Sequence, residues 1–144
     1  MENKIQLRDN ALKPEDFIEL RVSAGFLKTP FPQAEKALQN GLFSVVALCG
    51  ERAVGMGRLV GDGIMYWYIQ DVVVLPEYQG QGIGKAIVER LVQYAETNSL
   101  PCTKATIGLM AAKSKEPFYE KLGFTRRPDE NRGAGMFKYI NRNF

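Results

Sequence analysis

The chain has 144 residues, the length of one ordinary domain, and we predict a single domain over residues 1–144. Hydrophobic residues make up 45% and charged residues 24% of it, which is typical of a soluble globular protein. The net charge of +3 at pH 7 is too small to indicate a nucleic-acid-binding protein.

The first sixty residues predict strands and helices in an order that ends with a hairpin. The expected elements are a strand at 4–8, a helix that begins at Pro14, a short helix at 33–39, and strands at 43–48 and 52–60. Gly50 lies between the last two strands, where a glycine is typical of a hairpin turn.

The second half of the chain predicts a buried strand followed by a long helix. Residues 65–75 are almost wholly apolar, as expected for a strand buried on both faces. Apolar residues then recur at every fourth position from Ile83 to Ala95, which predicts an amphipathic helix. The remaining expected elements are a strand at 105–110, a helix at 116–122, and strands at 124–128 and 135–140. This order predicts a mixed sheet with helices on its faces, an α/β (α+β) fold.

Residue usage excludes several kinds of site. The chain has no histidine, which removes Ser-His and Cys-His nucleophile systems and most zinc sites, so we expect no metal. Cys49 and Cys102 lack paired spacing and are typical of reduced thiols in a cytoplasmic protein. No apolar run reaches the length of a membrane span and no signal-peptide pattern is present, so we expect a cytoplasmic protein that does not bind membranes.

Three glycines lie within five positions of the stretch QGQGIGK, residues 79–85, between the buried strand and the long helix. The spacing fits neither the G-x-G-x-x-G dinucleotide fingerprint nor a P-loop, because Ala86 follows Gly84-Lys85 where a P-loop has Ser or Thr. A plain strand-to-helix turn needs only one glycine. Three glycines at a helix N-terminus, where N–H groups lack partners, favour a site for an anion such as phosphate.

Two segments resemble the GNAT superfamily of N-acetyltransferases. The stretch VVVLPEYQGQGIGKAIVERL resembles its acetyl-CoA motif, in which Gln79, Gly82 and Gly84 match the family pattern. The stretch FYEKLGF, residues 118–124, resembles a second family motif. The resemblance covers nearly the whole chain. It implies a GNAT-like fold, in which a mostly antiparallel central sheet is splayed in the middle and flanked by about four helices.

The resemblance implies acetyl-CoA as cosubstrate and assigns its contacts to the main chain. The pyrophosphate is expected at the N–H groups of the glycine turn: Gln79, Gly80, Gln81, Gly82, Ile83, Gly84 and Lys85. The pantetheine arm is expected to pair like an extra strand with Val72, Val73 and Val74. In the family a bulge and a splay open that strand edge, so we expect both here.

The resemblance also implies an amine that attacks the acetyl thioester, with Tyr119 as the acid that protonates the leaving thiolate. The alternative for Tyr119 is a core aromatic. No ready base is present, because the family positions for Glu or His hold Tyr68 and Gln70 here. Asp71 is the nearest carboxylate, and it is a base only if a bulge turns it to the other face; its alternative is an ion-pair partner. Attack by an already neutral amine stays open.

The acceptor site is expected where the sequence offers aromatic residues near the sheet and in loops: Phe26, Phe31 and Trp67, with the loop at 127–135. Acidic residues in that loop favour a cationic amine, whereas its arginines favour an acidic ligand. The loop therefore does not select one acceptor, and we expect a small-molecule amine or a protein amine. Ala112 stands where relatives often have a cofactor-contacting Asn, so that contact is absent or supplied elsewhere.

We therefore predict an acetyl-CoA-dependent N-acetyltransferase that works by direct attack in a ternary complex. A non-catalytic acyl-CoA-binding sensor is the main alternative, because the carboxylate base is missing. A nucleic-acid-binding domain is a third possibility that no basic-aromatic stripe supports, and we expect no nucleic-acid partner. The resemblance also implies a homodimer, because many similar domains pair through their C-terminal strands; the sequence adds only the apolar segment at 135–140.

Overall fold

The structure is a computed structural model that describes residues 4–144. The chain divides into two compact units, one that ends at Leu109 and one that spans Met110–Phe144. Each unit is described by itself.

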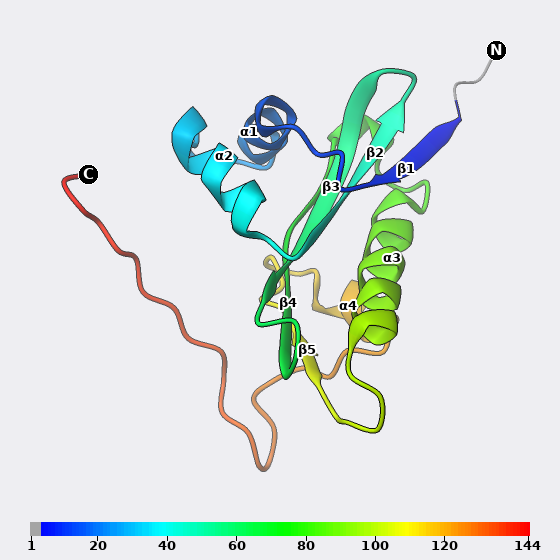
Figure 1. Cartoon of the computed structure of the whole chain (residues 1–144), viewed down its shortest axis with the longest axis vertical. Coiled ribbons are helices and arrows are strands. Elements are labelled where there is room, and N and C mark those ends of the chain that lie inside the picture. Colours follow the sequence, from blue (N-terminus) through cyan, green and yellow to red (C-terminus); the bar gives the residue numbers. More distant parts are fainter. Residues whose placement is uncertain (1–3) are drawn as a thin grey trace. The chain divides into compact units, whose positions relative to one another are not determined.

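The first unit is built on a five-stranded sheet in the order β1-β2-β3-β4-β5 (Figure 1). Neighbouring strands from β1 to β4 are antiparallel, whereas β4 and β5 are parallel. The strands are β1 (Ile5–Asp9), β2 (Phe43–Cys49), β3 (Arg52–Gly61), β4 (Tyr66–Val74) and β5 (Thr106–Gly108). The predicted mixed, mostly antiparallel sheet is confirmed.

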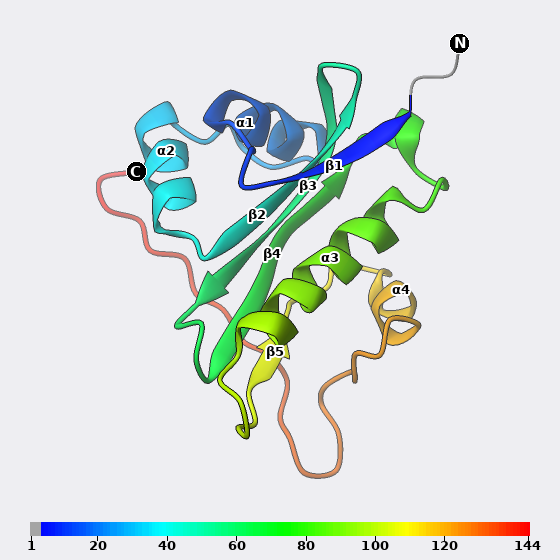
Figure 2. The same cartoon turned by 45° about the vertical axis from the view of Figure 1, so that its right-hand side comes forward.

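Helices cover both faces of this sheet. Figure 2 shows α1 (Pro14–Ser23) and α2 (Phe31–Asn40) on one face and α3 (Ile83–Asn98) on the other. Under α1 and α2 lies a core of apolar side chains: Leu12, Phe17, Ile18, Leu20, Ala34, Val46, Met56 and Val73. The predicted apolar stripe of α3 is buried, from Ile83 at 5% exposure to Ala95 at 4%.

Glycines in β3 allow α3 to approach the sheet closely. A Cβ atom added at Gly57 would lie 2.7 Å from Ile87 Cγ2 and 3.0 Å from Leu91 Cδ1, both on α3. Such distances are shorter than van der Waals contact, so the packing of α3 depends on the missing side chain at Gly57.

β4 carries the predicted bulge. The register against β3 passes from Met56↔Val73 to Arg58↔Gln70, so two β4 residues lie opposite one β3 residue. Asp71, one of the two, has a φ of 58°, in the left-handed region that non-glycine residues rarely adopt. The bulge is therefore marked by both register and backbone conformation.

The sheet also splays between its last two strands. β4 and β5 pair only from Tyr66↔Thr106 to Tyr68↔Gly108. Within the described part of the chain, the remainder of β4 has no strand partner on that side. The edge that the family resemblance required is thus open over the segment containing Val72 and Val74.

The second unit contains α4 (Glu116–Glu120), followed by a chain without regular secondary structure. The predictions of strands at 124–128 and 135–140 are wrong, because neither segment forms a strand. Apolar side chains in the second segment are exposed, Ile140 at 93% and Phe137 at 73%. An apolar pattern makes a strand only where a neighbouring edge satisfies its main-chain groups, and a single sequence does not reveal whether such an edge exists.

Candidate functional site

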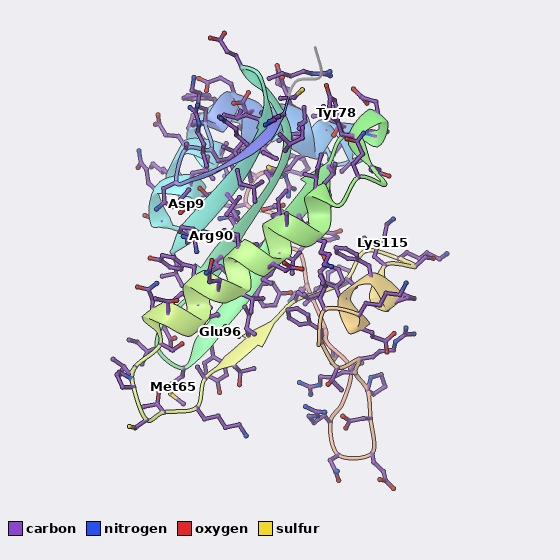
Figure 3. All side chains as sticks on the ribbon, turned by 90° about the vertical axis from the view of Figure 1, so that its right-hand side faces the viewer. Asp9, Met65, Tyr78, Arg90, Glu96 and Lys115 are labelled. Carbon is purple, nitrogen blue, oxygen red and sulfur yellow. The ribbon has the colours of Figure 1, made fainter. Side chains whose placement is uncertain are left out.

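The glycine turn joins the end of β4 to α3 through a short 3₁₀ helix, η1 (Pro76–Tyr78). Figure 3 marks its position by Tyr78, near the N-terminal end of α3, whereas Glu96 lies toward the other end. Gly80 and Gly82 have φ angles of 79° and 82°, which favour glycine. A Cβ at either position would meet no described atom within 4 Å, so the turn faces open space.

The N-terminus of α3 presents main-chain donors to that open space. The N–H group of Ala86 makes a helical bond of 3.0 Å to the carbonyl of Gly82. The N–H groups of Ile83, Gly84 and Lys85 precede it and have no helical carbonyl to bind. No described side chain caps this end, and its first turn holds no acidic residue. These donors, together with the positive end of the helix dipole, suit an anion.

The open edge of β4 lies directly before this turn. The N–H group of Leu75 donates to the carbonyl of Val54 in β3, at 2.9 Å. Main-chain groups alternate in direction along a strand, so those of Val74 and Val72 face the other side, where β4 has separated from β5. Gln79 Nε2 donates to the Val74 carbonyl at 3.0 Å, which holds the turn against the end of the strand.

Side chains of β3 also hold the turn in place. Arg52 at the start of β3 forms an ion pair with Glu77 of η1, with Nη2 and Oε1 3.0 Å apart. The Arg52 guanidinium carbon also lies 5.9 Å from the centre of the Tyr78 ring. The predicted binding segments, 72–74 and 79–85, are therefore neighbours on one surface of the first unit.

The sequence left two roles open for Asp71, that of the catalytic base and that of an ion-pair partner. Its side chain is 3% exposed, and its two carboxylate oxygens accept hydrogen bonds from two arginines. Arg21 Nη1 donates to Oδ1, and Arg58 Nε donates to Oδ2 at 2.9 Å. The geometry is that of the ion-pair alternative, and with both oxygens occupied we do not propose Asp71 as the base.

The bulge explains why Asp71 faces α1. Trp67 packs on the α3 face, edge-on to Tyr94 of α3 with ring centres 6.1 Å apart. Strict alternation would point residue 71 the same way. Instead Asp71 contacts Arg21 of α1, and Val72 lies against Gly57 on the α3 side, where its Cγ2 is 3.4 Å from an added Cβ. The extra residue has shifted the alternation.

Tyr68 lies where the splay begins. It pairs with Gly108 in the last step of the β4–β5 ladder. Its ring is half-buried, and the residue has an interaction partner in the structure. Its position at the start of the open edge keeps it a candidate contact for the reacting group.

Of the three aromatic residues predicted at the acceptor site, two are exposed and one is buried. Phe26 and Phe31 are 51% and 44% exposed. Trp67 is 5% exposed, and its Nε1 donates to Ser99 Oγ at 3.1 Å on the α3 side. We therefore correct the assignment of Trp67 to the acceptor site, because its ring is part of the core under α3.

Sequence reasoning missed Arg21 and Arg58. Each had a visible signal, because Arg58 interrupts the apolar strand GMGRLV and Arg21 lies among the inward positions of a short helix. A charge inside an otherwise apolar strand predicts a buried partner of opposite charge, since an unpaired one is costly. The partner, Asp71, could not be named without the bulge.

Tyr119 lies in α4 of the second unit. Its ring packs edge-on against Phe118 and Phe124, with ring centres 4.9 Å and 5.9 Å away. Burial raises the pKa of the Tyr119 phenol above its ordinary value of 10.0, because the charged phenolate is disfavoured away from water. The phenol therefore keeps its proton at neutral pH and is able to donate it.

Two further predictions concern metal and membrane. Among residues 4–144 no group of three or more potential His, Cys, Asp or Glu ligands comes together. In the same part of the chain no helix has the length and apolar character needed to cross a bilayer.

The first unit thus combines a splayed sheet, a bulged central strand and a glycine turn at a helix N-terminus. A sequence model of a protein family, described as "Acetyltransferase (GNAT) domain", matches residues 40–126, more than half of the chain. The chain belongs to the GNAT family of acetyltransferases. The resemblance inferred from the two motifs is confirmed.

Individual members of the GNAT family agree in sequence and in fold. The ycf52 protein of Pyropia yezoensis, named as an uncharacterized N-acetyltransferase, is 31% identical over 147 residues, which cover 95% of this chain and 81% of that protein. Serotonin N-acetyltransferase 2 (chloroplastic) of Oryza sativa subsp. japonica is 31% identical over 124 residues, or 83% of this chain and 60% of that one. A solved structure from methicillin-resistant Staphylococcus aureus, titled a probable acetyltransferase, superposes with a TM-score of 0.84 at 33% identity and covers 95% of this chain and 100% of that chain.

Proposed function

We propose that this GNAT protein is an acetyl-CoA-dependent N-acetyltransferase that moves the acetyl group to a primary amine. The observation that carries the proposal is the adjacency of two main-chain features in the first unit. Donors without helical partners at the start of α3 lie next to the open edge of β4. A ligand with a pyrophosphate and an amide-containing arm has groups that suit both features.

In the proposed complex, recognition of the coenzyme is by the main chain. N–H groups from Gly80 to Lys85 bind the pyrophosphate, and the amides of the pantetheine arm pair with main-chain groups of Val72 and Val74. The side chain of Gln79 donates to the Val74 carbonyl and its main-chain N–H group donates to the Pro76 carbonyl at 3.2 Å, so we propose that Gln79 holds the shape of the turn around the coenzyme.

The proposed reaction is one direct transfer within a ternary complex. The amine nitrogen forms a bond to the acetyl carbon, the carbon–sulfur bond breaks, and the nitrogen loses a proton. Tyr119 gives its phenolic proton to the leaving thiolate and regains one from solvent after the product leaves. Attack by an amine that is already neutral, with water accepting its proton, requires no carboxylate base. This fits the occupied oxygens of Asp71.

The choice of acceptor amine rests on exposed aromatic residues and on the name of one relative. Phe26 and Phe31 offer exposed aromatic rings at the loop between α1 and α2. The rice relative is named for serotonin, an aromatic amine. Aromatic amines are therefore the first acceptors to test, followed by polyamines, aminoglycosides and peptides with free amino groups.

The function is tested by release of the free coenzyme A thiol from acetyl-CoA with each amine of that panel. We expect release that depends on one class of amine. When both substrates are varied, double-reciprocal plots of the initial rate should give intersecting lines. Parallel lines would contradict direct transfer. Tight binding of acetyl-CoA without amine-dependent release across the panel would contradict the enzyme and favour the alternative, a non-catalytic acyl-CoA sensor.

Assembly and location stay predictions. The proposed homodimer rests on the exposed apolar residues of the C-terminal segment, such as Met136 at 87% exposure and Ile140 at 93%. Sedimentation at micromolar concentration checks it, and a monomer there would contradict it. The proposed location is the cytoplasm.

A further inference from the structure

Three charged side chains form a half-buried cluster against the β4 bulge, which we call the arginine clamp: Arg21, Arg58 and Asp71. The side chains of Arg21 and Arg58 are 22% and 14% exposed, and that of Asp71 is 3% exposed. Each arginine binds a different oxygen of the one carboxylate. Among the described residues neither arginine has another ion-pair partner, so a single Asp71 balances two charges.

Arg21 extends the clamp to the loop between α1 and α2. Its Nε donates to Thr29 Oγ1 at 3.3 Å, and its guanidinium carbon lies 4.4 Å from the centre of the Phe26 ring. The N–H group of Phe26 also donates to the main-chain carbonyl of Arg21 at 3.1 Å. The loop is therefore held by Arg21 at both of its contact residues.

Arg58 extends the clamp to α2 and α1. Its Nη1 donates to the carbonyl of Ala37 in α2 at 3.4 Å, and its guanidinium carbon lies 5.4 Å from the centre of the Phe17 ring in α1. Through these contacts one carboxylate on β4 joins two helices, the loop between them and β3.

The position of Asp71 is costly unless the clamp compensates it. A left-handed φ is disfavoured for a residue with a side chain, and a carboxylate out of water needs partners. The same two arginines offset both costs, because their hydrogen bonds hold the residue in this conformation and pair its carboxylate. Without Asp71 the bulge would lose its anchor, and two cations would remain with no counter-charge.

We propose that Asp71 is a positioning residue, which fixes the β4 bulge and, through Arg21, the loop 24–30 that carries Phe26. The strand edge for the acetyl donor and a wall of the acceptor site are then set by one ion-paired cluster. The role in acceptor binding rests on the proposed function, whereas the hold on the loop does not.

The first test uses Arg21→Gln, which releases the loop but leaves the Asp71–Arg58 pair. Lys28 is exposed in the loop, so trypsin cleavage between Lys28 and Thr29, followed by mass spectrometry, reports how often the loop opens. Removal of hydrogen bonds to a charged group should speed this cleavage about tenfold. Arg8→Gln, at an exposed arginine of β1, is the matched control and should leave the rate unchanged. Unchanged cleavage in Arg21→Gln would overturn the proposal, whatever the enzyme assays show.

The second test separates positioning from base catalysis in active enzyme. A positioning role predicts that Arg21→Gln raises the KM for the amine while the Kd for acetyl-CoA stays within about twofold, since the substitution frees the loop and leaves the coenzyme surface intact. It also predicts that Asp71→Asn speeds the trypsin cleavage and raises the amine KM. If Asp71 is instead the base, Asp71→Asn lowers kcat and abolishes the acidic limb of its pH profile, while KM and cleavage stay at wild-type values. That result would overturn the proposal.

The cleavage test and the kinetic test together also distinguish this proposal from the proposed function. Faster cleavage of Arg21→Gln, together with no amine-dependent turnover in the wild type, supports the clamp and contradicts the proposed acetyltransferase activity. Normal turnover with unchanged cleavage and KM in Arg21→Gln supports the enzyme and overturns the clamp. If Asp71→Asn does not fold, Arg21→Gln decides alone, because that substitution leaves Asp71 paired with Arg58.

Discussion

Gly82 is the residue at which the turn becomes a helix, and the absence of its side chain is what leaves the turn open. With a φ of 82° and open space around it, a side chain added there would strain the backbone and cover the adjacent N–H groups. We expect Gly82→Val to raise the Kd for acetyl-CoA about tenfold or more, since at least one hydrogen bond to a charged phosphate is removed. Isothermal titration calorimetry on the folded variant measures this change.

Gly50 supplies the matched control for that substitution. It also has a left-handed φ, 63°, and open space around it, but it lies in the hairpin between β2 and β3. Gly50→Val carries a similar backbone strain and should leave acetyl-CoA affinity unchanged. Equal affinity in Gly82→Val and the wild type would remove the glycine turn from the site.

Tyr119 carries the one proposed side-chain role in catalysis. Tyr119→Phe keeps the ring and its packing but removes the donor, so we expect kcat to fall about a hundredfold to ten-thousandfold with little change in acetyl-CoA Kd. Because burial raises the pKa of Tyr119 above 10.0, its loss of a proton should not limit the rate below that pH.

Steady-state kinetics with an amine for which chemistry limits the rate checks this expectation. Tyr139→Phe, at a tyrosine that is 76% exposed, is the control and should behave like the wild type. A folded Tyr119→Phe protein with wild-type kcat would leave Tyr119 as a core aromatic only.

Between elements, the contact of α3 with β3 depends on Gly57. Gly57→Ala would place a Cβ 2.7 Å from Ile87 Cγ2, so α3 or the strand has to shift. Overpacking of this kind costs about 1–3 kcal/mol of unfolding free energy. Urea denaturation measures the loss of stability, and Gly133→Ala, at a position with no described atom within 4 Å, is the control. Equal stability of the two variants would contradict the close packing of α3.

The hairpin between β3 and β4 makes a pH-dependent contribution to the free energy of unfolding. Asp62 Oδ1 accepts hydrogen bonds from the N–H groups of Ile64, Met65 and Tyr66. The bond from Tyr66 is the largest of the causes that lower the pKa of Asp62 below its ordinary value of 3.8. The folded state thus favours the charged form, which gives stability above pH 3.8 that is lost as the pH falls through the lowered folded-state pKa.

Comparison of the wild type with Asp62→Asn tests the direction of this pH dependence. The wild type should be the more stable protein at pH 7, and its advantage should shrink toward pH 2, as measured by urea denaturation at each pH. An advantage that grows in acid would show that the turn does not favour the carboxylate.

Much of this element-level structure could be predicted from the sequence, for identifiable reasons. The stripe from Ile83 to Ala95 and the hairpin at Gly50 are local patterns, and both are confirmed. The bulge was inferred only from the family resemblance, because the extra residue at Asp71 leaves no local signal. The pairing of Arg21 with Asp71 joins residues 50 positions apart, and a strand at 135–140 depends on a partner edge. Long-range partners of this kind are not encoded in a local pattern.

For the whole molecule, the proposed reaction draws on both units of the chain. The first unit carries the proposed coenzyme surface, made from main-chain groups that the sheet and α3 hold in place. The second unit supplies Tyr119, the proposed acid. In the proposed complex the coenzyme is recognised by backbone groups, which side-chain substitutions leave in place, whereas the acceptor amine is recognised by side chains.

We propose above that acetyl-CoA binds to the main chain of the glycine turn and the open edge of β4. Amide hydrogen exchange, followed by mass spectrometry with and without acetyl-CoA, measures those groups directly. We expect slower exchange in peptides covering 72–74 and 79–85 on binding, and unchanged exchange in β1. Binding that leaves both segments unchanged, or that protects β1 instead, would contradict it.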